Sequence, residues 1–230
     1  MIKTAILVDG GFYKVRAHHF AGDKSPEARA KELSDYCWAH INDQKDAELY
    51  RIFYYDCPPV SKKIFHPLTK AQVDLGKSPH FAWMNNFFDE LKKKRKFALR
   101  MGRLSEEQSH YLLTPEAVKR LCNGKVQVED LSQKDFKIDI VQKGVDMKIG
   151  LDIASLAYKK QVDQIVLISG DSDFVPAAKL ARREGIDFIL DPMGATIKPD
   201  LFEHIDGMRT KIKHFLAKTE EKPGDEPLEN

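Results

Sequence analysis

Residues 165–174 read Ile-Val-Leu-Ile-Ser-Gly-Asp-Ser-Asp-Phe, an apolar run that stops abruptly at small and acidic residues. The run Ile165–Ser169 is predicted as an apolar strand, because it is short, rich in isoleucine and valine, and bounded by glycine. A helix is predicted directly after it, over Phe174–Glu184, with Gly185 as its C-cap. A strand followed at once by a helix is typical of a parallel sheet in an α/β fold.

The same alternation continues along the chain in both directions. Further strands are predicted over Thr4–Val8, Leu49–Tyr55, Phe97–Met101 and Ile186–Leu190. Further helices are predicted over residues 26–43 (Ser25 as N-cap, Pro26 in the first turn), Phe81–Lys94, Val145–Lys160 and Leu201–Phe215. Strands separated by helices need right-handed crossovers, which predicts an α/β fold with a mostly parallel central sheet and helices on both faces.

The length of 230 residues suits one large domain, or one domain that carries an insertion. We expect a single domain over residues 1–216 with a less regular insertion at about 60–135. Residues 102–140 are expected to contain a small antiparallel excursion. Residues 217–230 are polar and rich in proline and glutamate, so this tail is expected to be disordered.

Composition and cysteine usage indicate a cytoplasmic globular protein. Hydrophobic residues make up 42% of the chain and charged residues 31%, which is ordinary for such a protein. Its 3 cysteines are scattered and lack a CxxC spacing, which argues for a reducing compartment and against structural zinc. The apolar run at the N-terminus is too short for a signal peptide, and no run has the length of a membrane span. We therefore expect a cytoplasmic location and no membrane partner.

Net charge is only +2, so the whole chain is not a strongly basic nucleic-acid binder. Lysines and one arginine do cluster in the block Lys92–Lys96, and three more lysines lie along the predicted last helix and beyond it, at Lys211, Lys213 and Lys218. Two interpretations stand for the block. It is either a solvated helix end or a surface that contacts phosphates through counterion release.

Four acids are predicted to gather where strands end. Asp9 ends the first strand and is followed by two glycines, Asp171 and Asp173 follow the strand Ile165–Ser169, and Asp146 lies at the start of a helix. Ligands of such sheets bind beyond the carboxyl ends of the strands. Four carboxylates that converge there repel one another unless a cation neutralises them. A hard divalent cation with oxygen ligands, such as Mg²⁺, fits this need and can activate water for attack on a phosphate.

Each acid also has a structural interpretation. Asp173 and Asp146 could cap the helices that they precede, and Asp171 could shape a turn. Asp9 is harder to explain in this way, because an acid at the end of a buried strand has little packing purpose. Asp152 lies six positions beyond Asp146, about 120° away around an ideal helix, so a supporting or surface position is expected for it.

The segments Val8-Asp9-Gly10, Lys143-Gly144-Val145-Asp146 and Ser169-Gly170-Asp171-Ser172-Asp173-Phe174-Val175-Pro176 resemble the NYN domain, a branch of the PIN-like ribonucleases. The resemblance is to the bacterial LabA/DUF88 group and spans about residues 3–215, with a looser match over 60–135. It implies a Rossmann-like PIN fold and cleavage of RNA that depends on Mg²⁺ or Mn²⁺. It places the catalytic, metal-binding acids at Asp9, Asp146, Asp171 and Asp173. Many members carry Asn three residues after the first Asp, where this chain has Phe12.

The predicted function is therefore a metal-dependent ribonuclease acting on single-stranded RNA rather than DNA, and the sequence leaves homo-oligomer formation open. Lys143 and Ser169 are expected to flank the acids and to contact the substrate, Lys143 through a phosphate next to the scissile one. The block Lys92–Lys96 would extend this track.

Other functions fit the sequence less well. A haloacid-dehalogenase-like phosphatase needs a second Asp where this chain has Gly11, and the Asp-Ser-Asp triplet alone is a weak sign of a glycosyltransferase. A non-catalytic RNA-binding module remains an alternative, in which aromatic side chains would stack on bases. The candidates for stacking are Phe12, Tyr13, Phe81, Trp83, Phe87 and Phe88. The four acids count against it, because a surface that only binds RNA gains affinity by losing them.

Overall fold

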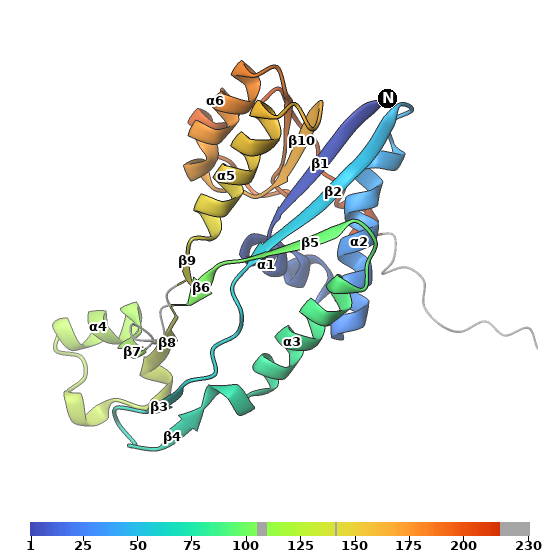
Figure 1. Cartoon of the computed structure of the whole chain (residues 1–230). Coiled ribbons are helices and arrows are strands. Elements are labelled where there is room, and N and C mark those ends of the chain that lie inside the picture. The colour runs from blue at the N-terminus through green and yellow to red at the C-terminus, as the bar shows by residue number, and fades with distance from the viewer. Residues whose placement is uncertain (105–109, 141, 217–230) are drawn as a thin grey trace, which may run out of the picture.

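A six-stranded, fully parallel sheet forms the centre of the computed structural model, which describes residues 1–104, 110–140 and 142–216 (Figure 1). The strands, in their order across the sheet, are β12 (Gly207–Met208), β11 (Asp187–Asp191), β10 (Gln164–Ile168), β1 (Ile2–Asp9), β2 (Ala47–Asp56) and β5 (Phe97–Met101). All five neighbouring pairs are parallel. The predicted α/β fold class is confirmed.

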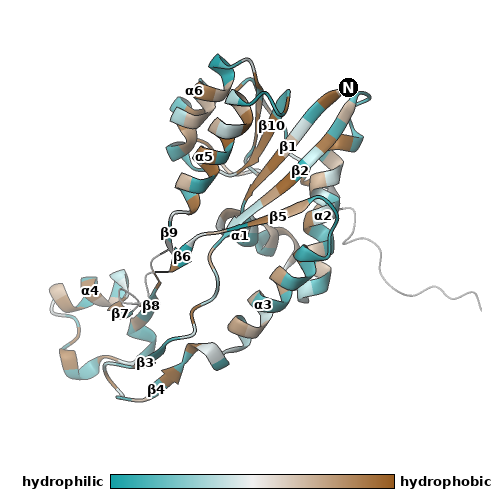
Figure 2. Cartoon of the chain, viewed as in Figure 1, coloured by the Kyte–Doolittle hydropathy of each residue, from teal (hydrophilic) through white to brown (hydrophobic). Residues whose placement is uncertain are grey.

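Helices cover both faces of this sheet, and alternate residues of the strands pack against them (Figure 1). One layer contains α1 (Gly10–Ala21), α2 (Pro26–Asn42), α3 (Pro79–Lys92) and α8 (Lys213–Leu216). The other contains α5 (Val145–Tyr158), α6 (Val175–Arg183) and α7 (Pro199–Phe202). In β1, Ile6 and Val8 face the α1 layer, whereas Ala5 and Leu7 face the α5 layer. Figure 2 shows the hydrophobic residues concentrated on these central strands.

Most predicted boundaries agree with the structure to within two or three residues. Ser25 caps α2 through a 3.2 Å hydrogen bond from Ala28 N, as expected. Helix α1 is one element that was not predicted from the sequence. The chain passes directly from β1 into this helix at Gly10 and Gly11. Gly10 is required there, since a Cβ would lie 2.5 Å from the carbonyl oxygen of Tyr55.

The helix predicted over Leu201–Phe215 is wrong. The structure has the short helix α7, then strand β12, then the short helix α8 in this stretch. Asp206 accepts hydrogen bonds from Arg182 Nε at 2.8 Å and from Phe188 N at 2.9 Å, which holds the chain extended beside β11. Pairing at the sheet edge therefore overrides the local helical pattern.

Small antiparallel units lie between β2 and α5, apart from the main sheet (Figure 1). They are the pairs β3 (Lys63–Phe65) with β4 (Gln72–Asp74), β6 (Arg103–Leu104) with β9 (Gln142–Lys143), and β7 (His110–Leu113) with β8 (Phe136–Asp139), together with helix α4 (Pro115–Cys122). Short 3-10 turns cover Leu75–Lys77, Val128–Asp130, Gln133–Asp135 and Ser172–Phe174 (η5). The expected antiparallel excursion is confirmed, whereas the tail at 217–230 lies outside the described residues. No helix in the described ranges has the length and apolarity needed to cross a membrane.

Candidate functional site

The connections between strands change direction between β1 and β10, in the middle of the sheet. The chain proceeds from β1 to β2 and β5 on one side, and from β10 to β11 and β12 on the other. From β1 the chain continues into α1 on one face, and from β10 it continues through η5 into α6 on the other face. Such a divergence leaves a binding site beyond the carboxyl ends of the two strands. Asp9 ends β1 and Asp171 follows β10, so two of the predicted acids lie at this point.

Asp9 is held by two hydrogen-bond donors. Its Oδ1 accepts from Phe12 N at 3.1 Å, and its Oδ2 accepts from the hydroxyl of Ser169 at 3.3 Å. The same hydroxyl accepts a 3.3 Å hydrogen bond from Asp171 N. Ser169 is fully buried, so one fixed hydroxyl joins the carboxylate of Asp9 to the backbone of Asp171.

Two of the four acids cap a helix, but they are not the two for which capping was expected. Asp9 caps α1, contrary to the expectation that it had little structural purpose, and Asp171 caps η5 by accepting from Asp173 N at 3.0 Å. Asp173 and Asp146 cap nothing, because α6 has no side-chain cap and α5 begins at Gly144 with φ 81° and no side-chain cap. Both of these carboxylates are exposed in the first turn of their helical segments.

Electrostatics links the four acids to one another. Burial raises the pKa of Asp9, hydrogen bonds from Phe12 and Ser169 oppose this, and the charge of Asp146 raises it further. Burial also raises the pKa of Asp146, and the charges of Asp171 and Asp173 add to the effect. In the described part of the chain none of the four forms an ion pair with Lys, Arg or His. They therefore form a field of negative charge without a directly paired cation among the described side chains.

The donor set suits a hard divalent cation, but the side chains do not already form a compact ligand cage. Within residues 1–104, 110–140 and 142–216, no three His, Cys, Asp or Glu side chains form a group that could hold a metal ion as they stand. All the available donors are carboxylate oxygens, the ligands that Mg²⁺ takes in small number alongside water. Asp146 and Asp173, which lie in helical first turns without a hydrogen bond from their side chains, have the freedom to turn toward a shared ion.

One further acid at this edge was not predicted. Asp56 ends β2, is 1% exposed, and accepts from Tyr54 Oη at 2.9 Å and from Cys57 N at 2.8 Å. It forms a 2.7 Å ion pair with Lys14 of α1. An acid at the end of a strand pattern was a visible signal in the sequence, but its pairing with Lys14 depends on the tertiary structure.

Two lysines lie near the acids and are held there in different ways. Lys143 lies in β9, opposite Arg103 of β6, and is exposed three residues before Asp146. Lys198, which was not predicted, donates a 3.1 Å hydrogen bond to the hydroxyl of Ser172, between Asp171 and Asp173. Lys143 is therefore placed near the acids by its position in the chain, and Lys198 by its hydrogen bond to Ser172.

The block Lys92–Lys96 cannot extend a track from these acids. It links the end of α3 to the start of β5, so it lies at the amino ends of the parallel strands, opposite the edge that carries Asp9. Lys92 pairs with Asp89 at 2.8 Å and Lys93 with Glu90 at 2.5 Å, both one turn back on α3. The prediction of a substrate track here is wrong, and the block is a solvated helix end.

Most of the aromatic residues named as stacking candidates belong to the core. Tyr13 and Phe87 are fully buried and Phe88 is nearly so. The ring of Phe12 lies over Gly170, where a Cβ would come within 2.8 Å of it. Trp83 differs from these, since it lines a pocket between α1 and α3. Asp152 lies away from the acids and accepts from Tyr55 Oη and Arg100 Nε, in agreement with the supporting position expected for it.

The fold and the acids together define an α/β protein of the Rossmann-like type. Its acidic site lies at the topological switch point of the sheet, between the carboxyl ends of β1 and β10. The chain belongs to the NYN domain family, whose family description matches residues 84–198, half of the chain. That stretch includes Lys143, Asp146, Ser169, Asp171 and Asp173, and Asp9 precedes it. The family is generally one of PIN-like nucleases that use divalent metal ions, which indicates a nucleic-acid substrate.

The fold also resembles the crystal structure of a protein of unknown function from Vibrio parahaemolyticus. The similarity covers 90% of this chain and 91% of that one, at 16% sequence identity and a TM-score of 0.43. A search of curated proteins gives no match to this chain.

Proposed function

We propose that this protein is a metal-dependent ribonuclease that hydrolyses phosphodiester bonds of single-stranded RNA. Asp9, Asp146, Asp171 and Asp173 would hold Mg²⁺ or Mn²⁺ and act as its catalytic acids. The observation that supports this most strongly is the set of mutually repelling carboxylates at the switch point of the sheet, which lack cation partners in the described residues, in a chain of the NYN family.

Each of these residues has a definite task under the proposal. Ser169 and Phe12 N hold the carboxylate of Asp9 in one orientation, and both of its oxygens keep a lone pair for a further contact. Asp171 is oriented in the same way by Asp173 N. A bound divalent ion would lower the pKa of a water molecule and neutralise charge on the phosphate oxygens. Lys143 would contact a phosphate next to the scissile one.

Cations at the rim are needed because carboxylates repel an RNA strand. Lys143 and Lys198 are two exposed lysines near the acids, one before α5 and one bonded to Ser172. Both can offset the negative field where a phosphate would approach. Single-stranded RNA is favoured because the chain as a whole carries a net charge of only +2, and a duplex presents a higher density of phosphate charge.

The test is incubation of the purified protein with labelled single-stranded RNA and DNA, each with Mn²⁺, Mg²⁺ or EDTA. We expect cleavage of RNA with either metal, none with EDTA, and none by Asp171→Asn protein. Binding of RNA without cleavage in any metal would support the non-catalytic RNA-binding module instead. One observation favours that second candidate: the carboxylates do not stand ready as a ligand group.

A further inference from the structure

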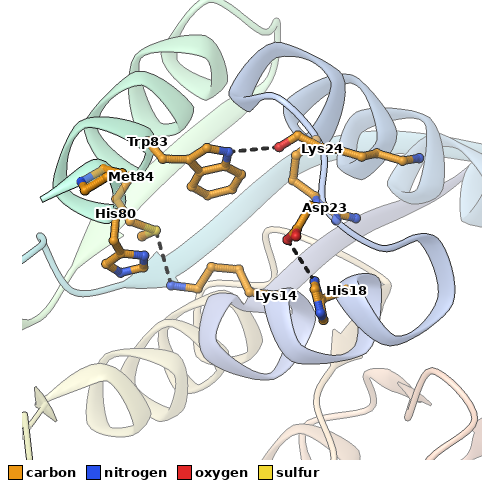
Figure 3. A pocket seen from close by; sticks show the side chains of 9 residues that line it. Lys14, His18, Asp23, Lys24, His80, Trp83 and Met84 are labelled. Carbon is orange, nitrogen blue, oxygen red and sulfur yellow. Dashed lines mark hydrogen bonds and ion pairs between the residues drawn. The ribbon is translucent and has the colours of Figure 1, made fainter. Parts of the chain in front are cut away.

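We propose that the pocket between α1 and α3 binds one nucleobase of the RNA strand, a near neighbour of the phosphate at the four acids. This proposal deepens the proposed function and rests on it. The pocket has a volume of about 390 Å³ and lies on the α1 layer of the sheet (Figure 3). Sites for small ligands typically have volumes of about 300–1,000 Å³ and mostly apolar walls with a few polar groups.

One wall of the pocket is a fixed aromatic surface. Trp83 donates from Nε1 to the carbonyl oxygen of Lys24 at 2.9 Å, which sets the orientation of the indole. Its ring stacks on the buried ring of Phe87, with centroids 5.1 Å apart and planes 17° apart. Pro79 and Met84 add apolar surface beside it. A rigid indole with apolar neighbours is the surface on which proteins stack single-stranded bases.

Nitrogen-bearing side chains surround this wall (Figure 3). Lys14, His18, Lys24, Arg29 and His80 all line the pocket. Base edges and phosphates present many acceptors, and these side chains are donors.

Carboxylates balance the charges of these side chains. Lys24 and Arg29 both contact the single carboxylate of Glu32, so this trio retains one positive charge. Asp23, which also lines the pocket and lies 3.1 Å from His18 Nδ1, brings one negative charge (Figure 3). Partial burial lowers the pKa of His80 and the charge of Lys14 lowers it further, which favours the neutral ring, and a neutral imidazole can both donate and accept. The pocket therefore offers polar donors and acceptors beside an apolar wall, which suits a heteroaromatic base.

The pocket is connected to the acidic site through Lys14 and Asp56. Asp56 belongs to the set Ile52, Tyr54 and Asp56 of β2 that faces the α1 layer, and Lys14 meets it there at 2.7 Å. The charge of Asp56 acts on both His80 in the pocket and Asp9 at the acids. Lys14 lies five residues after Asp9, about 7.5 Å along α1. An RNA strand that crosses the carboxyl edge of the sheet would thus contact the acids on one side and the pocket on the other.

Trp83 offers a direct reporter, because the chain contains only 2 tryptophans. In a Trp38→Phe protein, Trp83 is the sole indole. This protein is titrated in EDTA and low salt with a single-stranded RNA oligonucleotide, and then with a set of oligonucleotides that each lack one base. We expect the intact RNA to quench Trp83 fluorescence. One missing base at a single position should abolish the quenching and weaken binding roughly tenfold.

Variants separate the pocket from the rest of the surface. Trp83→Leu should bind RNA roughly tenfold more weakly. If Trp83→Leu fails to fold, His80→Ala serves instead, because this side chain is exposed and its loss leaves the core intact. Tyr158→Leu removes an exposed aromatic side chain at the far end of α5, on the opposite helix layer, so this variant is the matched control and should bind normally.

Absence of quenching by RNA, or equal binding by every oligonucleotide of the set, would overturn the proposal. Quenching by a free nucleoside monophosphate with the affinity of the oligonucleotide would also overturn it, in favour of a mononucleotide site. The proposed function is tested separately, by cleavage of RNA in Mn²⁺. Quenching without cleavage would contradict the ribonuclease proposal and support the base pocket. Cleavage without quenching would support the ribonuclease and contradict the base pocket.

Discussion

The buried hydroxyl of Ser169 donates a 3.3 Å hydrogen bond to Asp9 Oδ2, and so joins the carboxyl ends of β10 and β1. These strands are neighbours in the sheet, although 160 positions separate the two residues. Because Ser169 has no exposed surface, water cannot replace its hydroxyl as the partner of Asp9. The orientation of the first predicted metal ligand thus depends on a residue that itself carries no charge.

Replacing this serine should lower activity more than stability. Ser169→Ala removes one hydrogen bond, worth about 1 kcal/mol, and leaves almost the same volume. Groups that orient a metal ligand typically contribute about 10- to 100-fold to metal affinity or activity, so we expect a loss of that size. The measurement is the Mn²⁺ dependence of RNA cleavage, beside thermal melts in EDTA. Ser155→Ala on α5 is the matched control, and an equal effect in both proteins would refute the orienting role.

Removing a negative charge from the site should abolish cleavage without harming the fold. The pKa of Asp9 is raised by burial, so its ionisation near pH 7 costs folding free energy. Asp9→Asn relieves this cost and keeps a good capping side chain for α1. We expect Asp9→Asn and Asp171→Asn proteins without metal to melt at the same temperature as wild type or higher, and to be inactive. A variant that cleaves RNA normally would show its acid to be a cap alone.

Lys143, near the acids, and Lys92 and Lys93, at the opposite edge of the sheet, should differ in their effects on the cleavage and binding of RNA. Lys143→Ala should reduce turnover at saturating RNA, because its proposed contact lies beside the reacting phosphate. Replacing Lys92 and Lys93 together with Gln should leave the salt dependence of binding unchanged, since both lie at the opposite edge of the sheet. Each phosphate contact that is lost from a single strand would flatten the log–log slope by about 0.7. A flatter slope in the double variant would place RNA on the amino edge.

Acid should destabilise the protein through His40. This fully buried ring bonds Asp191 Oδ2 through Nε2 at 2.8 Å, and its Nδ1 has no partner in the described residues. Burial lowers its pKa despite the hydrogen bond and the charge of Asp191, and the charges of Arg209 and Lys211 lower it further. A group with a lowered pKa stabilises the fold above its unfolded value of about 6.5, and that stability is lost as the pH falls.

Unfolding in urea between pH 7 and pH 5 checks this expectation. The free energy of unfolding of wild type should fall by up to about 1.4 kcal/mol per pH unit from this residue. His40→Gln should flatten the dependence, whatever its effect on absolute stability. His19→Gln changes an exposed histidine of α1 and should leave the slope as in wild type. Parallel slopes for wild type and His40→Gln would exclude the buried ring as the source.

The sheet could be predicted from the sequence because its strands are short apolar runs with helices between them. Helix α1 escaped prediction since Gly10 and Gly11 argue against a helix locally, whereas Asp9 caps one. The last predicted helix failed for the opposite reason. Its local pattern is helical, but Asp206 ties that stretch to β11, and such a distant partner is invisible in the chain.

The candidate site divides in the same way. Asp9 and Asp171 could be predicted because strand ends are visible in the sequence. Asp56 also lies at a visible strand end, but it was not predicted. The pairing of Asp56 with Lys14 and the contact of Lys198 with Ser172 needed coordinates. The position of Lys92–Lys96 could have been predicted, because a segment that follows a helix and precedes a parallel strand lies at the amino edge.

The central place of β1 has a consequence for how the chain acquires its structure. One edge of β1 pairs with β2, about 45 residues later, but its other edge pairs with β10 only across 160 positions. During synthesis, the apolar strands β1 and β2 are complete long before β10 emerges, and one row of backbone groups on β1 stays unpaired meanwhile. Such high contact order slows folding, and an open apolar edge invites pairing with other chains. Refolding from denaturant should therefore be slow and should lose yield as protein concentration rises.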